Sequence, residues 1–99
     1  MNIQLITVKN GQTIMAEVDS MEDKLMIIKQ PVIVVSQQTK EGPMMAFAPF
    51  LDYSNEFKSG IRLALSDVLC ITTPVVELEN QYNKMFGSGI MLASTNLKL

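Results

Sequence analysis

The chain has 99 residues, which is enough for one small domain and too few for two. It contains no histidine and one cysteine, which excludes Ser-His-Asp or Cys-His catalysis, histidine-ligated zinc and an intramolecular disulfide. With 8 basic and 10 acidic residues the net charge is −2, so the chain has no general attraction for nucleic acid.

Apolar residues are in excess. Hydrophobic residues make up 47% of the chain and charged residues 18%. A domain of this size buries roughly 60–65% of the surface of its unfolded chain, so apolar surface is left over for contact with other molecules. The sequence predicts neither a signal peptide at residues 1–5 nor a membrane span. Together with the lone Cys70, which we expect to be buried in a strand, this favours a reducing, cytoplasmic location.

The dipeptide Asn10-Gly11 predicts a two-residue type I′ turn, because both residues tolerate positive φ. A hairpin closed by this turn pairs Lys9 with Gln12. One face is then the apolar core, and the other is half apolar, so we expect another element to cover it. The first face holds Ile3, Leu5, Thr7, Ile14, Ala16 and Val18, and the second holds Gln4, Ile6, Val8, Thr13, Met15 and Glu17.

Residues 24–35 form a long β-branched run with Pro31 in its middle. Proline cannot donate to a strand ladder, so this position predicts a bulge, a sharp bend or a sheet edge. A long strand that bends at its centre suits a small, strongly curved barrel. The elements that follow are a loop over 36–43, a strand over 44–51 with an internal Pro49, a polar loop over 52–60, and short strands over 61–65 and 68–72 with a tight break at Ser66-Asp67.

A helix over about 74–86 is predicted near the C-terminus. Thr73 is a good N-cap residue, and Pro74 suits the first helical position. Gly87 is the expected terminator, and we expect the tail over 87–99 to be mostly unstructured, with an added edge strand as the alternative. An apolar stripe at helical spacing comprises Val75, Leu78, Tyr82, Met85 and Phe86.

Catalytic interpretations have little support in the sequence. Acidic pairs such as Glu22 with Asp23 could serve a carboxylate metal site or acid–base chemistry, but solubility at turns is the simpler explanation. The segment 87–89 lacks the spacing of a nucleophile elbow and of a phosphate-binding loop. We therefore expect no enzyme activity, no metal and no cofactor.

The order of strands and turns resembles the Sm/LSm family of small barrels. The run 14–19 with Met21 is similar to the first Sm motif, an apolar strand that ends in aspartate before a short loop. The run 65–71 is similar to the second motif, a tight turn that feeds an apolar last strand. Segments 47–50, 68–71, 80–83 and 86–89 look like those of small Sm-like proteins of marine phage and metagenome origin. The resemblance implies a mainly β fold: a five-stranded, strongly bent barrel over about 2–72 in a single domain, with the helix and tail after it.

The resemblance also implies where RNA would bind, at the loops after the second strand and before the last strand. The first loop offers no asparagine or aromatic residue, and Ser66-Asp67 stand where the family has Arg-Gly. These departures remove the phosphate attraction and the base-stacking platform. The residues carried over onto this site are Asp19, Met21, Asp23, Lys24, Arg62, Ser66 and Asp67.

Self-association of the chain is predicted from the composition of two strands as well as from the resemblance. The runs 32–35 and 44–47 lack the charged residues that protect natural edge strands. Head-to-tail pairing of identical chains closes into a ring when the rotation permits, and the resemblance implies about five to seven subunits. We expect a non-catalytic binding or scaffold ring in the cytoplasm of a cell or phage host, with an RNA-binding ring as the alternative. The predicted interface residues are Val32, Val34, Met44, Phe47, Val68 and Cys70.

Overall fold

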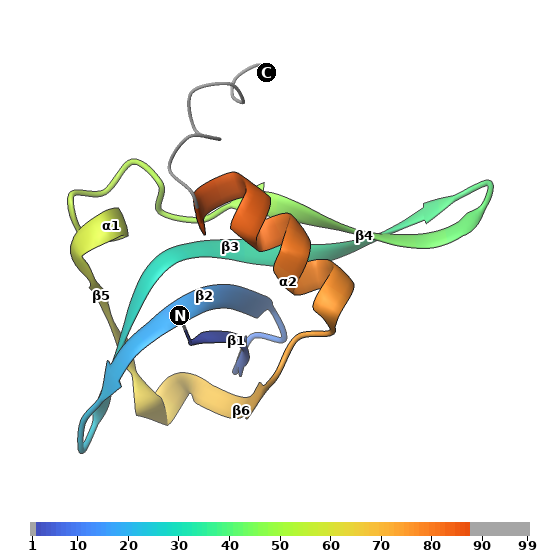
Figure 1. The fold of residues 1–99 in the computed structure, drawn as a ribbon. Helices are drawn as coiled ribbons and strands as arrows, with labels where there is room; N and C mark the ends of the chain where they lie inside the picture. The colour runs from blue at the N-terminus through green and yellow to red at the C-terminus, as the bar shows by residue number, and fades with distance from the viewer. Residues whose placement is uncertain (1, 88–99) are drawn as a thin grey trace.

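A computed structural model describes residues 2–87 as a mainly β fold with a short C-terminal helix (Figure 1). All strand pairs are antiparallel. In chain order the elements are β1 (Ile3–Val8), β2 (Thr13–Met21), β3 (Leu25–Thr39), β4 (Gly42–Pro49), α1 (Glu56–Ser59), β5 (Ile61–Ala64), the 3₁₀ turn η1 (Leu65–Asp67), β6 (Val68–Thr72), α2 (Val76–Tyr82) and the π-helical turn η2 (Asn83–Gly87).

The strands form one sheet in the order β4-β3-β2-β1-β6, and β5 pairs with the first part of β3. The mainly β class and the C-terminal helix are confirmed. The sheet has six strands rather than the five that the resemblance implies, since β5 and β6 are separate strands that pair with β3 and β1 respectively. Within residues 2–87, β4 and β6 do not pair with each other, so the chain does not close the sheet by itself.

The register of the first hairpin corrects the prediction by one residue. Thr7 lies opposite Thr13 rather than opposite Ile14. The connection has three residues, closed by a hydrogen bond from the Val8 amide to the Gln12 carbonyl (3.0 Å), and Gly11 adopts a φ of 93°. Three-residue hairpin loops end with a residue in this left-handed region, and Gly11 occupies it here. Side chains alternate along a strand, so a one-residue shift brings the other face of β2 onto the same side of the sheet as a given face of β1.

Both faces of the central strands β1, β2 and β3 contribute to a buried core. In β2 the consecutive residues Ile14, Met15 and Ala16 are all buried, because alternate side chains enter different cores. The first core consists of Ile6, Ile14, Ala16, Val18, Met26 and Ile28. The second consists of Ile3, Met15, Val32, Leu78 and Tyr82, and α2 covers it. The expectation that another element covers the second face is therefore confirmed, although different residues face it.

The bend in β3 is confirmed at Gln30-Pro31. Between the pairs Met15–Val32 and Glu17–Lys29, β3 contains one more residue than β2. Gln30 adopts a φ of 51°, which is unusual for a residue other than glycine, and Pro31 is fully buried. This bulge redirects the strand, so its first part pairs with β5 and its last part with β4.

The Tyr82 hydroxyl binds this bulge from the second core. It donates to the carbonyl oxygen of Gln30 at 2.8 Å, and the carbonyl oxygen of Lys29 is 3.3 Å away. Burial of the phenol raises the pKa of Tyr82 above its ordinary value, and the charge of Glu17 adds to this rise, whereas a backbone hydrogen bond from Glu17 lowers it. The C-terminal helix is thus fastened to the point where β3 bends.

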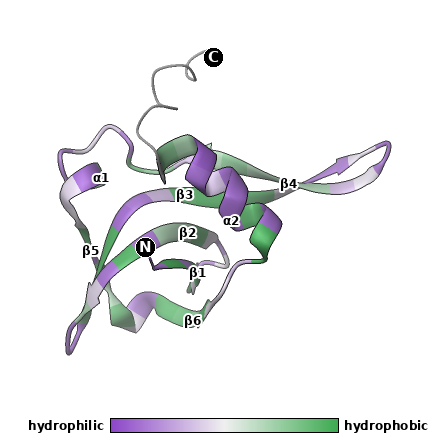
Figure 2. Cartoon of the chain, in the orientation of Figure 1, coloured by the Kyte–Doolittle hydropathy of each residue, from purple (hydrophilic) through white to green (hydrophobic). Residues whose placement is uncertain are grey.

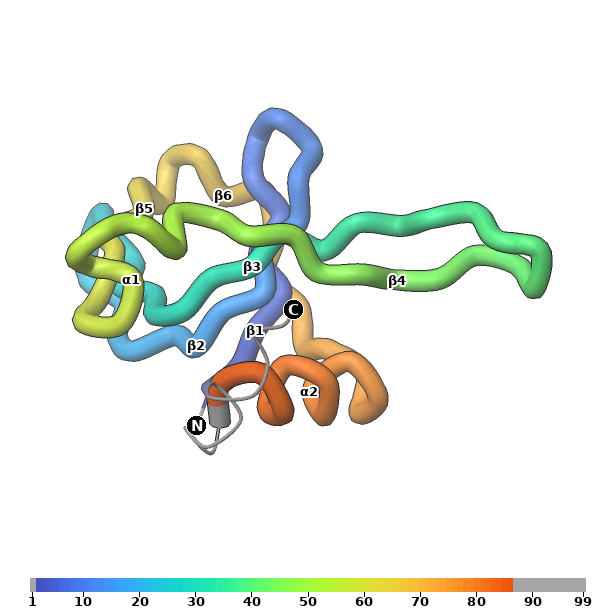
Figure 3. The backbone as a smooth tube through the Cα atoms, turned by 90° about the horizontal axis from the view of Figure 1, so that it is seen from above, coloured from blue at the N-terminus to red at the C-terminus, as the bar shows by residue number. Residues whose placement is uncertain are grey.

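The loop predicted over 36–43 is instead the outer part of a two-stranded ribbon that extends beyond the body of the molecule (Figure 1, Figure 3). Ladder pairs continue outward to Thr39–Gly42. The Thr39 hydroxyl secures the tip by donating to the Gly42 carbonyl at 2.6 Å. Its polar composition suggested a loop, but a ribbon with solvent on both faces needs no apolar alternation. Figure 2 shows the hydrophilic tip.

The helix begins two residues later than predicted, with Val75 in the N-cap position. Leu78 and Tyr82 of the predicted apolar stripe are buried, and Phe86 packs against the second core. Val75 is 64% exposed and Met85 is 39% exposed, so these two members of the stripe face outward. Most of the predicted unstructured tail, residues 88–99, lies outside the described part of the chain.

Candidate functional site

The two loops predicted to bind RNA lie next to each other. The first is the connection 22–24 between β2 and β3, and the second is η1. The Leu65 amide donates to the Lys24 carbonyl at 3.0 Å, which joins them. On the other side of η1, the Lys9 amide donates to the Asp67 carbonyl at 2.8 Å. The backbone therefore places η1 between the 22–24 loop and the first hairpin turn.

Two of the predicted RNA-site residues line different cavities: Asp67 lines a cavity beside the first hairpin turn, and Arg62 lines another beside the β4–β5 connection. Met21, Asp23, Lys24, Ser66 and Asp67 are all exposed on or beside the adjoining loops. Asp23 and Asp67 place two carboxylates there. Among these five side chains, Lys24 is the only cation and none is aromatic.

Asp19 and Arg62 lie on strands near these loops. Asp19 is the extra residue at a second bulge, in β2, and forms an ion pair with Lys29 at 3.5 Å. Arg62 is exposed on β5 and lies opposite Ile27 of β3. Ser20 lies opposite Ile27 on the other side, so Arg62 shares a sheet face with Ser20. Charges of both signs are mixed on this face.

A cavity of about 370 Å³ between the first hairpin turn and η1 was not anticipated from the sequence. Lys9, Asn10 and Gln12 were treated only as turn residues, although they contribute polar groups to it. Asn10 is already engaged, since its Oδ1 accepts from the Gln12 amide at 2.9 Å. The lining residues are Val8, Lys9, Asn10, Gln12, Ile14, Phe50, Leu63 and Asp67.

The predicted interface residues divide into core and edge. Val32 is 3% exposed and packs in the second core, so it offers little surface to a second subunit. Val34 and Phe47 are half-buried against the same core. Met44 is 55% exposed on β4. Val68 is half-buried on β6.

Cys70 corrects the expectation of a buried thiol, because it is exposed on β6. The strand lies at the edge of the sheet and pairs only with β1 among the described strands, so one of its sides is free. Sequence pattern could not distinguish an edge strand from an interior one here, since both are short and apolar.

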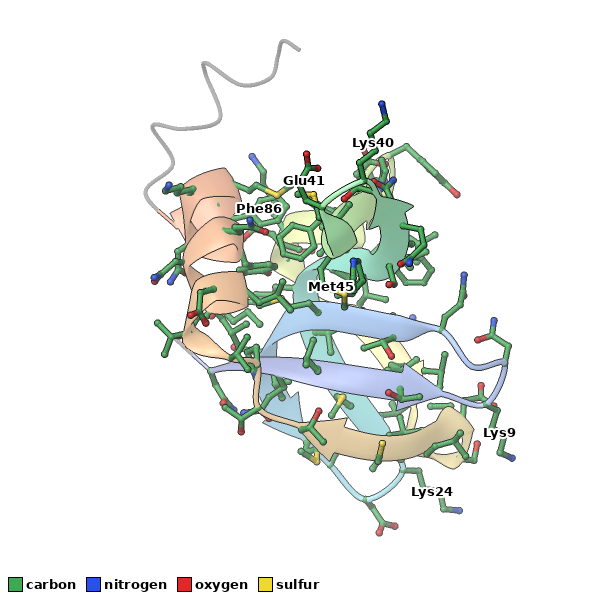
Figure 4. The ribbon with its side chains drawn as sticks, turned by 90° about the vertical axis from the view of Figure 1, so that its right-hand side faces the viewer. Lys9, Lys24, Lys40, Glu41, Met45 and Phe86 are labelled. Atoms are coloured by element: carbon green, nitrogen blue, oxygen red, sulfur yellow. The ribbon has the colours of Figure 1, made fainter. Side chains whose placement is uncertain are left out.

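Exposed apolar side chains gather on and near the two edge strands. A cavity of about 230 Å³ brings Met44 and Met45 of the ribbon beside Val75 and Leu78 at the start of the helix. Figure 4 looks along the ribbon, and in that view Met45 lies above β2 and to the right of the helix. We call the exposed residues Met44, Met45, Leu69, Ile71, Val75 and Val76 the edge surface. Five of these six are missing from the sequence-based interface set, and one of the five, Val75, is named only in the helix stripe.

Two other features, a metal centre and a membrane-spanning helix, are not seen in the part of the chain that is described. No three side chains capable of metal ligation cluster within residues 2–87. None of the helices there has the length and apolar character needed to cross a membrane. Comparison with protein-family models and with curated proteins finds no match for this chain.

Proposed function

We propose that the chain is a homo-oligomeric, Sm-like ring protein that acts as a non-catalytic binding or scaffold module. The observation that carries the proposal is that β4 and β6, at opposite ends of one sheet, each have an edge left unpaired within residues 2–87. Free strand edges template pairing with another chain, and soluble proteins usually protect them with charge. These edges carry Met44, Met45, Leu69 and Ile71 instead.

Pairing of β4 from one chain with β6 from the next would satisfy both edges. Such an interface is heterologous, since different surfaces of identical subunits meet, and it forms a ring when successive rotations close. The bent β3 and the 3₁₀ turn before the last strand support the resemblance to the Sm barrel. The edge surface would supply apolar burial in addition to backbone hydrogen bonds.

Size-exclusion chromatography with light scattering tests the proposal. We expect the unmodified chain to elute as an oligomer several times its 11.0 kDa mass. Leu69→Lys places a charge on the β6 edge, where the side chain is 61% exposed, and should shift the population toward monomer. Tyr53→Lys is the matched control, because Tyr53 is 84% exposed on the β4–β5 connection. A stable monomer of the unmodified chain at micromolar concentration would overturn the proposal.

RNA is the second candidate ligand of such a ring. The Leu65–Lys24 hydrogen bond holds the 22–24 loop next to η1. This arrangement favours RNA as a ligand, because the resemblance to Sm proteins implies that RNA would bind at these two loops. We expect a uridine oligomer to bind with an affinity that falls steeply as salt rises. Lys24→Ala should weaken this binding, whereas Lys40→Ala at the ribbon tip should not. Absence of binding at low salt would exclude RNA and leave the ring proposal intact.

A further inference from the structure

A separate cavity of about 290 Å³ lies between the end of the C-terminal helix, β4 and the β4–β5 connection. Three of the four phenylalanines of the chain line it: Phe47 of β4, Phe57 of α1 and Phe86 of η2. The Phe57 and Phe86 rings are 5.9 Å apart between centroids and meet at 63°. We call this cavity the phenylalanine pocket. Its walls are completed by Pro31, Val32, Ala48, Pro49 and Met85.

Asp52 is the one ionisable side chain that lines the phenylalanine pocket. The only ion pair among residues 2–87 joins Lys29 to Asp19, so no described cation neutralises Asp52. The Asp52 side chain is exposed, and its backbone lies in a hydrogen-bonded turn. The Leu51 carbonyl accepts from the Ser54 hydroxyl at 2.7 Å and from the Ser54 amide at 3.0 Å. The pocket therefore combines aromatic walls with a lone negative charge.

This combination selects for a particular cation. The faces of aromatic rings attract cations, and the attraction grows when the cation is desolvated. An ammonium that carries alkyl groups is weakly hydrated, and its alkyl groups can contact Pro49 and Met85. The volume lies near the lower limit of about 300 Å³ for small-molecule sites, which suits a head group rather than a large ligand.

We propose that the phenylalanine pocket binds an alkylated ammonium group, either in a free molecule such as choline or on a methylated lysine side chain. The Phe47, Phe57 and Phe86 rings contact the alkyl groups and stabilise the charge. Asp52 contributes the opposite charge. Figure 4 places Phe86 on the side of the molecule away from Lys9 and Lys24, so the site is distinct from the loops considered for RNA. A single chain supplies every lining residue, so the site does not depend on ring assembly.

Methyl NMR of methionine-labelled protein tests the proposal directly. Met85 lines the phenylalanine pocket and serves as the reporter, whereas Met21 at the end of β2 does not line it and serves as the internal control. We expect choline and an acetylated trimethyllysine amide to shift the Met85 signal saturably. The tighter of the two identifies the source of the group. The neutral isostere 3,3-dimethylbutanol should bind about fivefold more weakly than choline, because it lacks the charge.

Asp52→Asn should weaken choline binding without affecting the neutral isostere. Asp23→Asn, on the exposed 22–24 loop, is the matched control and should change neither. Equal binding of choline and the isostere would show a merely apolar cleft and overturn the proposal. A Met85 signal that none of the three ligands shifts would overturn it as well, and both results are read on the unmodified protein.

Discussion

Tyr82→Phe tests whether the helix is fastened to the bend of β3 by a hydrogen bond. The side chain is fully buried, and its hydroxyl donates to the Gln30 carbonyl at 2.8 Å. Phenylalanine preserves the ring and its packing but removes the donor, so it leaves an acceptor at a buried position without this partner. Such a loss costs about 1–3 kcal/mol. In a domain of this size, each 1 kcal/mol corresponds to about 4–8 °C in Tm.

The same phenol predicts a pH dependence. The pKa of Tyr82 is raised in the folded chain by burial, whereas in the unfolded chain it returns to about 10. The unfolded chain therefore loses this proton first as pH rises, and the free energy of unfolding falls above pH 10. Tyr82→Phe lacks this group, so its stability difference from the unmodified chain should shrink between about pH 10 and 11.

Urea unfolding followed by circular dichroism, at one fixed protein concentration, measures both effects. Fixed concentration matters because self-association would contribute to apparent stability. Tyr53→Phe is the control, because Tyr53 is 84% exposed and should leave the midpoint unchanged. Equal midpoints for the unmodified chain and Tyr82→Phe at pH 7 would refute the role of the hydrogen bond. A stability difference that stays constant to pH 11 would refute the titration argument.

Three further substitutions probe the backbone and the surface charge. Gly60→Ala should destabilise the fold by about 2 kcal/mol or more, because φ is 137° and a Cβ would lie 2.8 Å from Ile27 Cγ2. Gly11→Ala should cost less, because φ is 93° but the space around its Cβ is open, and equal urea midpoints for the two variants would contradict the steric argument. Asp19→Asn should change the free energy of unfolding by less than about 1 kcal/mol, because its ion pair is largely exposed, and a larger loss in the same assay would show a stronger role.

Much of the fold could be predicted because strong local signals were present. Pro31 marked the bend of β3, and the Thr73-Pro74 signal placed the C-terminal helix to within two residues. The hairpin register was wrong because Asn10-Gly11 fits both a two-residue turn and a three-residue loop with Gly11 in the left-handed region. Both strand faces are apolar, so hydrophobic pattern could not choose between the two registers.

The candidate sites were harder to predict, because they depend on long-range contacts. The phenylalanine pocket joins residues from β4, α1 and η2, which lie far apart in the sequence. Asp52 begins the polar loop predicted over 52–60, and no motif there indicates a site. Cys70 was misassigned to the core because edge position is a property of the sheet rather than of the strand. Only the resemblance to the Sm/LSm family predicted that the 22–24 loop and η1 lie next to each other.

The two-sided sheet has a consequence for how the molecule opens. β3 carries ladders to β2, β4 and β5, so its amides are released only when several ladders separate. Of the two cores, only the second contains residues of α2. The helix can therefore separate from the sheet while the first core stays intact. We expect hydrogen exchange to resolve two cooperative units. Amides of α2 should exchange at a low opening energy, and those of β3 near its centre should approach the energy of global unfolding.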